Sequence, residues 1–328
     1  MANNRRRWAT TAAAALLAGS AVAVVATRAR RDPHESSAVV PPLELTPVHR
    51  GGTGQPLLLL HGIGAIWRAW SPVLPYLEPH HEVIVPTLHG HAGGPDLDPE
   101  VEPSVQALAD GIEDELDRLG LQKVHIAGNS LGGWIGIELA RRGRAQSLVL
   151  LSPAGAWRSP RRIRMTSHGV RFSLGALARY SHRAEAMAER RLLRWALLAG
   201  QVAHPHRVPR ESLVTYIHAS GHSPVVDPLL RVLHRNPVEP LPADRDYPVR
   251  LVWADRDLVL PFKHFGSPML ERLPGAELIR LQGVGHVPMS DDPARVAELI
   301  LEVTRAADGT GSAAVSAQRG DGNVQQRC

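Results

Sequence analysis

Short apolar runs alternate with amphipathic segments along most of this chain, and this alternation limits the folds that are open to it. The apolar runs are PLLLLHG, HEVIVPT, VHIAG, SLVLLS, VRLVWAD and AELIRLQ. Such runs are typical of strands that are buried on both faces of a sheet. Helical spacing occurs between them, as in residues 104–119. The pattern predicts an α/β fold with a mostly parallel, doubly wound sheet that helices cover on both faces.

One long segment interrupts the alternation. Between about residue 156 and residue 241 there is no buried-strand signal, whereas several helical pieces carry apolar and aromatic side chains. An insertion of this size between two strands would sit at one edge of the sheet. We therefore expect residues 156–241 to form a helical cap inserted into the α/β domain.

The two ends of the chain differ from its middle. A cluster of arginines precedes an apolar run at 8–27, and a second basic cluster follows it. A run of about twenty apolar residues can span a bilayer, so we expect residues 1–31 to anchor the protein to a membrane, with a cleaved signal peptide and secretion as the alternative. We expect a linker at 32–42, the α/β domain at 43–305, and a disordered tail at 306–328, because the tail holds few large apolar residues.

Composition excludes several classes of site. The chain has 328 residues, of which 44% are hydrophobic, so it can bury a substantial core. Its single cysteine, Cys328, rules out a disulfide framework or a cysteine metal site within one chain. The net charge of +5 comes from an arginine bias along the whole chain, and we expect no nucleic-acid partner.

The stretch GNSLGG places Ser130 between Gly128 and Gly132, at the point where a strand run gives way to a helix. Glycine and serine are common in ordinary turns, which is one interpretation. The other is a strained turn that holds the serine hydroxyl out of the backbone, where a substrate can reach it.

Later strand ends carry the groups that a serine nucleophile needs. A serine hydroxyl requires a nearby base, and the base requires a third group that orients it. Asp255 and Asp257 directly follow the run VRLVWA, and His286 lies in a glycine-flanked loop after the next strand run. The carboxyl ends of parallel strands meet at one edge of the sheet, so these groups can converge.

Four motifs in this order resemble those of the α/β-hydrolase family. They are HGIG, GNSLGG, ADRDLVLP and GVGHVP, and the resemblance covers about residues 43–305. It implies an esterase-like or lipase-like enzyme without a cofactor, with Ser130 as nucleophile and His286 as base. The family's acid stands three residues after a small residue that closes the strand, here Ala254, so the resemblance favours Asp257 over Asp255.

The resemblance also implies an oxyanion hole. We assign it to the backbone N–H groups of Ile63, in HGIG, and of Leu131, which follows the nucleophile. We expect His61 to be a structural histidine that bonds to backbone.

The expected reaction is cleavage of an ester or a related acyl bond of a hydrophobic small molecule. Aromatic residues after HGIG and in the cap are candidates for the substrate pocket. They are Trp67, Trp70, Trp157 and Trp195. Two alternatives stay open: a carbon–carbon bond hydrolase of the meta-cleavage type, and a non-catalytic binding protein. Family members with an aspartate nucleophile, such as epoxide hydrolases, are disfavoured because Ser130 occupies that position.

The remaining polar clusters favour simpler interpretations. His89 with His91, and His204 with His206, lack a carboxylate or cysteine partner at ligand spacing, so we expect loop histidines and no metal. The arginines of the cap could bind an anionic substrate or lipid headgroups, but the arginine bias of the whole chain favours a solvated face.

Overall fold

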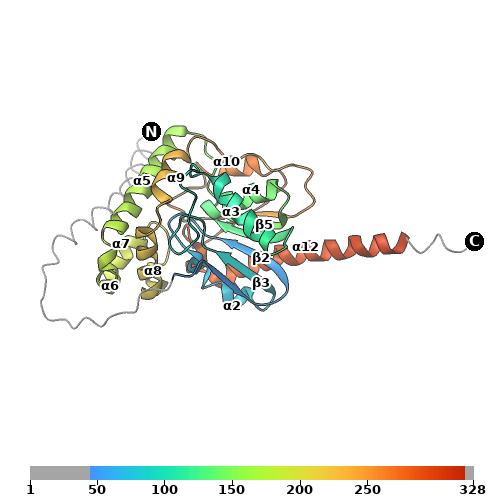
Figure 1. The fold of residues 1–328 in the computed structure, drawn as a ribbon, viewed down its shortest axis with the longest axis horizontal. Coiled ribbons are helices and arrows are strands. Elements are labelled where there is room, and N and C mark those ends of the chain that lie inside the picture. Colours follow the sequence, from blue (N-terminus) through green and yellow to red (C-terminus); the bar gives the residue numbers. More distant parts are fainter. Residues whose placement is uncertain (1–44, 322–328) are drawn as a thin grey trace, which may run out of the picture.

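The computed structural model describes residues 45–321, and a seven-stranded sheet forms its centre (Figure 1). The strands are β1 (Val48–Gly51), β2 (Gln55–Leu60), β3 (His81–Pro86), β4 (Val124–Asn129), β5 (Ala145–Leu151), β6 (Val249–Ala254) and β7 (Glu277–Leu281). Their order is β1-β3-β2-β4-β5-β6-β7, and all neighbours are parallel except β1, which pairs antiparallel with β3. The mostly parallel sheet predicted from the apolar runs is confirmed; the short edge strand β1 was not predicted.

Helices cover both faces of the sheet. One face packs against α3 (Val105–Arg118), α4 (Leu131–Arg141) and α10 (Gly266–Arg272). The other packs against η1 (Trp67–Trp70), α2 (Leu74–Leu77), α11 (Pro288–Asp291) and α12 (Pro293–Asp321). Successive strand residues point to opposite faces, so each apolar run of the strands contributes to both hydrophobic cores.

The predicted helical insertion lies between β5 and β6. It comprises α5 (Pro160–Arg179), η2 (Ser181–Arg183), α6 (Ala184–Glu189), α7 (Arg191–Leu198), η3 (Pro205–Arg207), α8 (Arg210–Gly221) and α9 (Val226–Val232). Buried side chains of these helices continue the core on the α3–α4 face of the sheet. Figure 1 shows the cap helices gathered at one end of the molecule, away from the projecting end of α12.

The last helix extends past the predicted domain boundary. We expected disorder from residue 306, whereas α12 continues to Asp321. Its continuation is tied to the sheet, because the Asp308 carboxylate accepts hydrogen bonds from Gln146 (2.9 Å) and His125 (3.2 Å). These hydrogen bonds join residues more than 160 positions apart. The disorder prediction used only the local composition of the tail, which carries no information about such contacts. Residues 322–328 lie outside the described part of the chain.

The predicted membrane anchor cannot be compared with the structure. The run at 8–27 and the linker at 32–42 lie outside the described residues, so both stay predictions. Within residues 45–321, no helix combines the length and apolar character that crossing a bilayer requires.

Candidate active site

Ser130 lies in a strained turn between β4 and α4. Its φ of 55° and ψ of −116° fall in a region that side-chain-bearing residues rarely adopt. Close packing requires glycine two residues before and two residues after Ser130. A Cβ on Gly132 would lie 2.2 Å from the Leu60 carbonyl oxygen, and one on Gly128 would lie 2.4 Å from that of Gly132. The strand, the turn and the helix can therefore approach closely only when these positions lack side chains.

The loop after β2 lies beside this turn. A Cβ built on Gly62 would be 3.3 Å from the Cβ of Ser130. Within residues 45–321, the amides of Ile63 and Leu131 donate no hydrogen bond to another protein group. Two free N–H groups next to a strained serine are available to an oxyanion.

His61 holds the loop after β2 in place. Its Nε2 accepts a hydrogen bond from the Leu88 amide (3.0 Å), so its proton resides on Nδ1, which donates to the Gly62 carbonyl (2.8 Å). Burial, together with the neighbouring His91, lowers the pKa of His61 to about 3. The ring is therefore neutral at pH 7 and acts as a backbone brace, as expected from the sequence.

Asp257 and His286 are in direct contact. Asp257 Oδ2 lies 2.8 Å from His286 Nδ1, and both side chains are buried. The other oxygen, Oδ1, accepts hydrogen bonds from the amides of Val259 (3.0 Å) and Leu260 (2.7 Å). Three donors thus fix the carboxylate, and one of them is the imidazole.

Asp255, the other candidate for the acid, makes different hydrogen bonds. Its carboxylate accepts from the Val284 amide at 3.3 Å, and its own amide donates to the Leu281 carbonyl at 2.9 Å. It ties the loop after β6 to the loop after β7 and makes no contact with the imidazole among the described residues.

Asn129 connects the serine turn to the histidine loop. Its side-chain amide donates to the carbonyl of His286 (2.9 Å) and to that of Leu151 (3.0 Å). The sequence analysis did not identify Asn129, although its position directly before Ser130 was the available signal.

Asp291 is a second buried carboxylate next to the histidine loop. Its Oδ2 accepts from the amides of Gly285 (2.7 Å) and Ala203 (2.8 Å), and its Oδ1 accepts from that of His204 (2.8 Å). Ala203 and His204 belong to the cap, so this one side chain joins the cap to the residue before His286. The sequence analysis missed it as well.

The four tryptophans proposed for the pocket occupy different environments. Trp70 is fully buried in the core on the α12 face, and Trp67 is 9% exposed there and stacks on His49. Their placement in a pocket is therefore corrected: both belong to the hydrophobic core on that face of the sheet. Trp157 is half-buried and meets Trp134 of α4 edge to face, with ring centroids 6.1 Å apart. Trp195 is 61% exposed on α7.

The histidine pairs do not form a metal site in the described part of the chain. Residues 45–321 contain no group of three or more His, Cys, Asp or Glu arranged to hold a metal ion. His91 is fully buried, which lowers its pKa to about 4, and its ring meets that of His61 edge to face.

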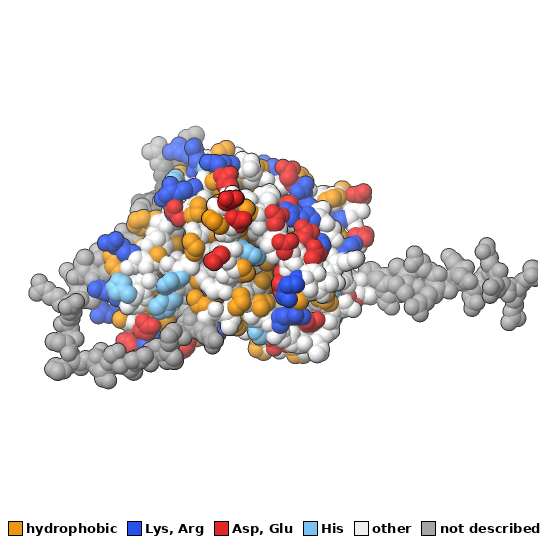
Figure 2. All heavy atoms as spheres, in the orientation of Figure 1, with side chains coloured by type: hydrophobic (Ala, Val, Ile, Leu, Met, Phe, Trp, Pro, Cys, Tyr) orange, Lys and Arg blue, Asp and Glu red, His pale blue; other side chains and the backbone are white. Residues whose placement is uncertain are grey.

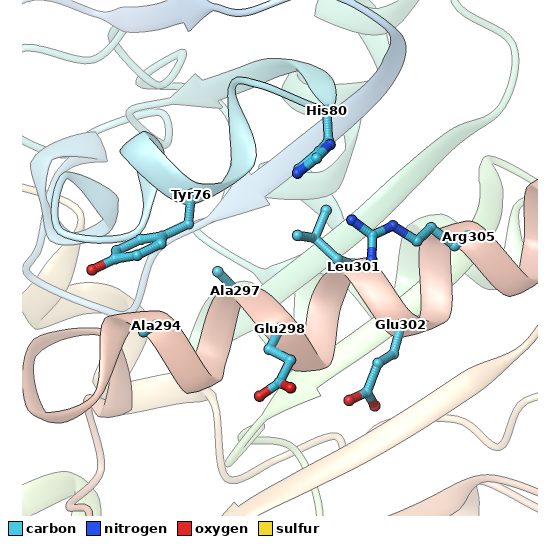
Figure 3. Close-up of a pocket in the computed structure, with 8 residues that line it drawn as sticks. All are labelled: Tyr76, His80, Ala294, Ala297, Glu298, Leu301, Glu302 and Arg305. Carbon is cyan, nitrogen blue, oxygen red and sulfur yellow. The ribbon is translucent and has the colours of Figure 1, made fainter.

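A surface groove of about 350 Å³ lies between α2 and α12. Figure 3 shows Tyr76 and His80 on one side and residues of α12 on the other. The carboxylates of Glu298 and Glu302 on α12 are paired with Arg295. The groove includes none of the residues discussed above as site candidates.

Comparison with known proteins identifies the kind of protein that shares this arrangement. The family described as "Alpha/beta hydrolase family" matches residues 57–299. The epoxide hydrolase EphH of Mycobacterium tuberculosis is 36% identical over 206 residues, which are 60% of this chain and 93% of that protein. A putative carbamate hydrolase, RutD of Pseudomonas savastanoi, is 30% identical over 76% of this chain and 94% of its own. A solved esterase from Thermogutta terrifontis superposes with a TM-score of 0.60 at 21% identity, over 79% of this chain and 93% of that one.

Proposed function

Because the chain belongs to the alpha/beta hydrolase family, we propose that it is a serine hydrolase that cleaves an ester or related acyl bond of a hydrophobic small molecule. Ser130 is the nucleophile, His286 the general base and Asp257 the acid that orients the base. The observation that carries this proposal is the contact between Asp257 and His286, on the loops that follow β6 and β7.

The hydrogen bond to Asp257 selects the reactive form of His286. Since Nδ1–H donates to the carboxylate, Nε2 carries a lone pair and can accept the Ser130 proton. The buried carboxylate then stabilises the imidazolium that forms. Two backbone amides also donate to Asp257 and hold its carboxylate in place during this step.

The reaction then follows the course of acyl transfer. Ser130 Oγ attacks the acyl carbon, and the negative oxygen of the tetrahedral intermediate accepts hydrogen bonds from the amides of Ile63 and Leu131. His286 gives its proton to the leaving alcohol, which departs. Water, deprotonated by His286, attacks the acyl-enzyme and releases the acid and free Ser130.

The relative named epoxide hydrolase raises the question of epoxide opening. Epoxide opening through a covalent ester requires a carboxylate nucleophile, and Ser130 provides a hydroxyl. Acyl transfer is the reaction that a hydroxyl nucleophile beside free amides favours. The carbon–carbon bond hydrolases use the same groups, so the substrate panel must separate them from esterases.

The test combines a fluorophosphonate probe with a panel of p-nitrophenyl acetate, butyrate and hexanoate, a styrene-type epoxide and a vinylogous diketone. We expect the probe to modify Ser130 and the esters to turn over, with higher kcat/KM for the longer acyl chains. Ser130→Ala abolishes labelling, whereas Ser152→Ala, a buried serine that also has a positive φ (41°), keeps it. Turnover of the epoxide or the diketone without ester turnover would overturn the proposed substrate class. Absence of labelling would overturn the serine mechanism.

A further inference from the structure

The cap is rich in arginine and strongly positive. Residues 156–241 contain fourteen arginines, no lysine and five acidic residues, a net charge of +9, whereas the whole chain carries +5. Two stretches of the cap, 156–184 and 190–210, contain no acidic residue at all. The cap therefore has a large positive excess, whereas the rest of the chain taken together is net negative.

Many of these arginines are free on the surface. Arg158, Arg171 and Arg210 form ion pairs with acidic side chains. A second set is exposed and forms no ion pair within the described residues. It consists of Arg161, Arg164 and Arg179 on α5 and Arg190 and Arg191 at the start of α7.

Large apolar side chains are exposed on the same two helices. Leu192 is 85% exposed and Trp195 61% exposed on α7, and Met165 and Phe172 are 57% and 56% exposed on α5. Residues seven apart, or three apart, lie on one face of a helix, so each pair shares a face. The opposite faces of both helices are already buried in the cap by other residues, so these four side chains are not needed for folding.

The arginines stand beside the apolar side chains. Arg161 is one turn before Met165 and Arg179 is two turns after Phe172, so both share the exposed face of α5, and Arg190 and Arg191 begin the helix that exposes Leu192. Figure 2 shows blue and orange side chains intermixed over the cap, whereas most red ones lie over the α3–α4 side of the molecule. We call this surface the cap outer face: Met165, Phe172, Leu192, Trp195 and the five unpaired arginines.

We propose that the cap outer face docks onto an anionic lipid bilayer. Arginine binds phosphate groups, while tryptophan, leucine and phenylalanine side chains enter the boundary between headgroups and acyl chains. Large apolar side chains exposed to this extent, beside five unpaired cations, are unusual on a surface that contacts only water. They indicate a binding surface. The two acid-free stretches of the cap complement a negative membrane surface, whereas a second copy docked through the same face would bring the same positive charge.

Docking would place the cap between the bilayer and the catalytic groups. Cap residue Ser220 contacts the carbonyl of Gly64 in the loop after β2, at 3.4 Å, and Asp291 joins the cap to the histidine loop. The interaction itself does not depend on the proposed reaction, so it is tested by binding alone.

The test uses a fluorophore at a single engineered cysteine in the full chain. Cys328 is the one native cysteine, so Cys328→Ser removes background labelling. Leu192→Cys reports on the cap outer face, and Val101→Cys, 42% exposed on a loop before α3, is the matched control. The protein is mixed with phosphatidylcholine vesicles that contain or lack one quarter phosphatidylglycerol, with a quencher on the lipid acyl chains.

We expect quenching at residue 192 and none at residue 101, only with the anionic vesicles, and a loss of quenching in 1 M salt. Arg190→Gln with Arg191→Gln should weaken the vesicle affinity measured at residue 192 by about ten-fold. Arg118→Gln with Lys123→Gln, which removes the same charge from the sheet domain, should not. A local reporter is needed because the apolar run at 8–27 could by itself bring the chain to vesicles.

Three results would overturn the proposal. Equal quenching at residues 192 and 101 would mean that the chain binds the vesicle without a specific contact of the cap outer face. No change at residue 192 would mean that the face stays in water. A signal at residue 192 that depends on protein concentration and needs no lipid would assign the face to a second copy.

Discussion

The side-chain amide of Asn129 lies 2.9 Å from the carbonyl oxygen of His286, although 157 positions separate them in the sequence. The same amide group donates to the Leu151 carbonyl at the end of β5. One side chain thus holds together the serine turn, the neighbouring strand and the histidine loop. Both hydrogen bonds are buried, and the Leu151 carbonyl also accepts from the Ser130 amide (3.1 Å), so the loss of the Asn129 amide would fall mainly on the His286 carbonyl.

Replacing Asn129 by alanine tests this connection. The buried His286 carbonyl then loses this donor, while the Leu151 carbonyl keeps the Ser130 amide (3.1 Å), and the free energy of unfolding should fall by about 1–3 kcal/mol. His286 also loses a backbone support, so kcat should fall while KM changes little. Urea unfolding and ester kinetics on the same preparation measure both effects. Asn236→Ala, at an exposed position, is the control; equal stability and kcat in both variants would contradict a bridging role for Asn129.

The choice between the two loop carboxylates gives a second prediction. Asp257→Asn should reduce kcat by about 10⁴-fold, because the amide can hold His286 in the wrong tautomer. Its oxygen can still accept from Val259 and Leu260, so the loop should stay folded. Asp255→Asn keeps an acceptor for Val284 and should change kcat by less than about ten-fold. The reverse ranking in steady-state kinetics would move the acid to Asp255.

The sequence predicted the parts of the fold that depend on local patterns. Six strands had runs rich in apolar residues, although β7 also contains Glu277 and Arg280, and the glycines around Ser130 indicated a close approach of strand and helix. β1 was missed because its four residues, VHRG, are partly exposed and carry no apolar period. An edge strand pairs with only one neighbouring strand and is partly exposed. Fewer packing contacts therefore require apolar residues in its sequence.

The sequence predicted that Asp257 and His286 could meet, which the structure shows, but not the side chains that hold their loops in place. Asp257 and His286 follow strand runs, and parallel strands bring such positions together. Asn129 bonds to a carbonyl 157 positions away, and Asp291 bonds to amides 87 and 88 positions away, which no local pattern encodes. Trp67 and Trp70 were misplaced for a related reason: an aromatic residue after a loop can turn toward the core as readily as toward a pocket.

Asp291 gives a third prediction. Asp291→Asn replaces one acceptor oxygen by an NH₂ group that faces a backbone N–H, which unpairs at least one of the three amides. The residue before His286 and the cap segment at Ala203 should then separate. We expect kcat to fall by about ten- to hundred-fold. A displacement of a catalytic group by about one ångström has an effect of this size.

Asp292→Asn is the matched control for this variant. Asp292 is the next residue, and its side chain accepts from the Arg295 amide at the start of α12, a bond that asparagine can also make. Its kcat should stay near that of the unchanged protein. Comparing kcat with the thermal unfolding midpoint separates positioning from general destabilisation. A lower midpoint with unchanged kcat for Asp291→Asn would assign it a structural role only.

The buried pair His61 and His91 gives the last prediction, on acid sensitivity. The pKa of His61 is lowered to about 3 and that of His91 to about 4, chiefly by burial. An unfolded histidine binds a proton near pH 6.5, so below that pH the unfolded state takes up protons that the folded state refuses. Stability is therefore retained above pH 6.5 and is lost as the pH falls toward the folded-state values.

At pH 5 the loss from His61 alone should be about 2 kcal/mol relative to pH 7. Urea unfolding at both pH values measures it. His61→Gln removes the titrating ring, so this variant should be less stable at pH 7 but should lose less stability between pH 7 and pH 5. His168→Gln, exposed on α5, should show the full loss of the unchanged protein. Parallel losses in all three proteins would mean that other groups cause the acid sensitivity, and that His61 already carries a proton in the folded protein at pH 5.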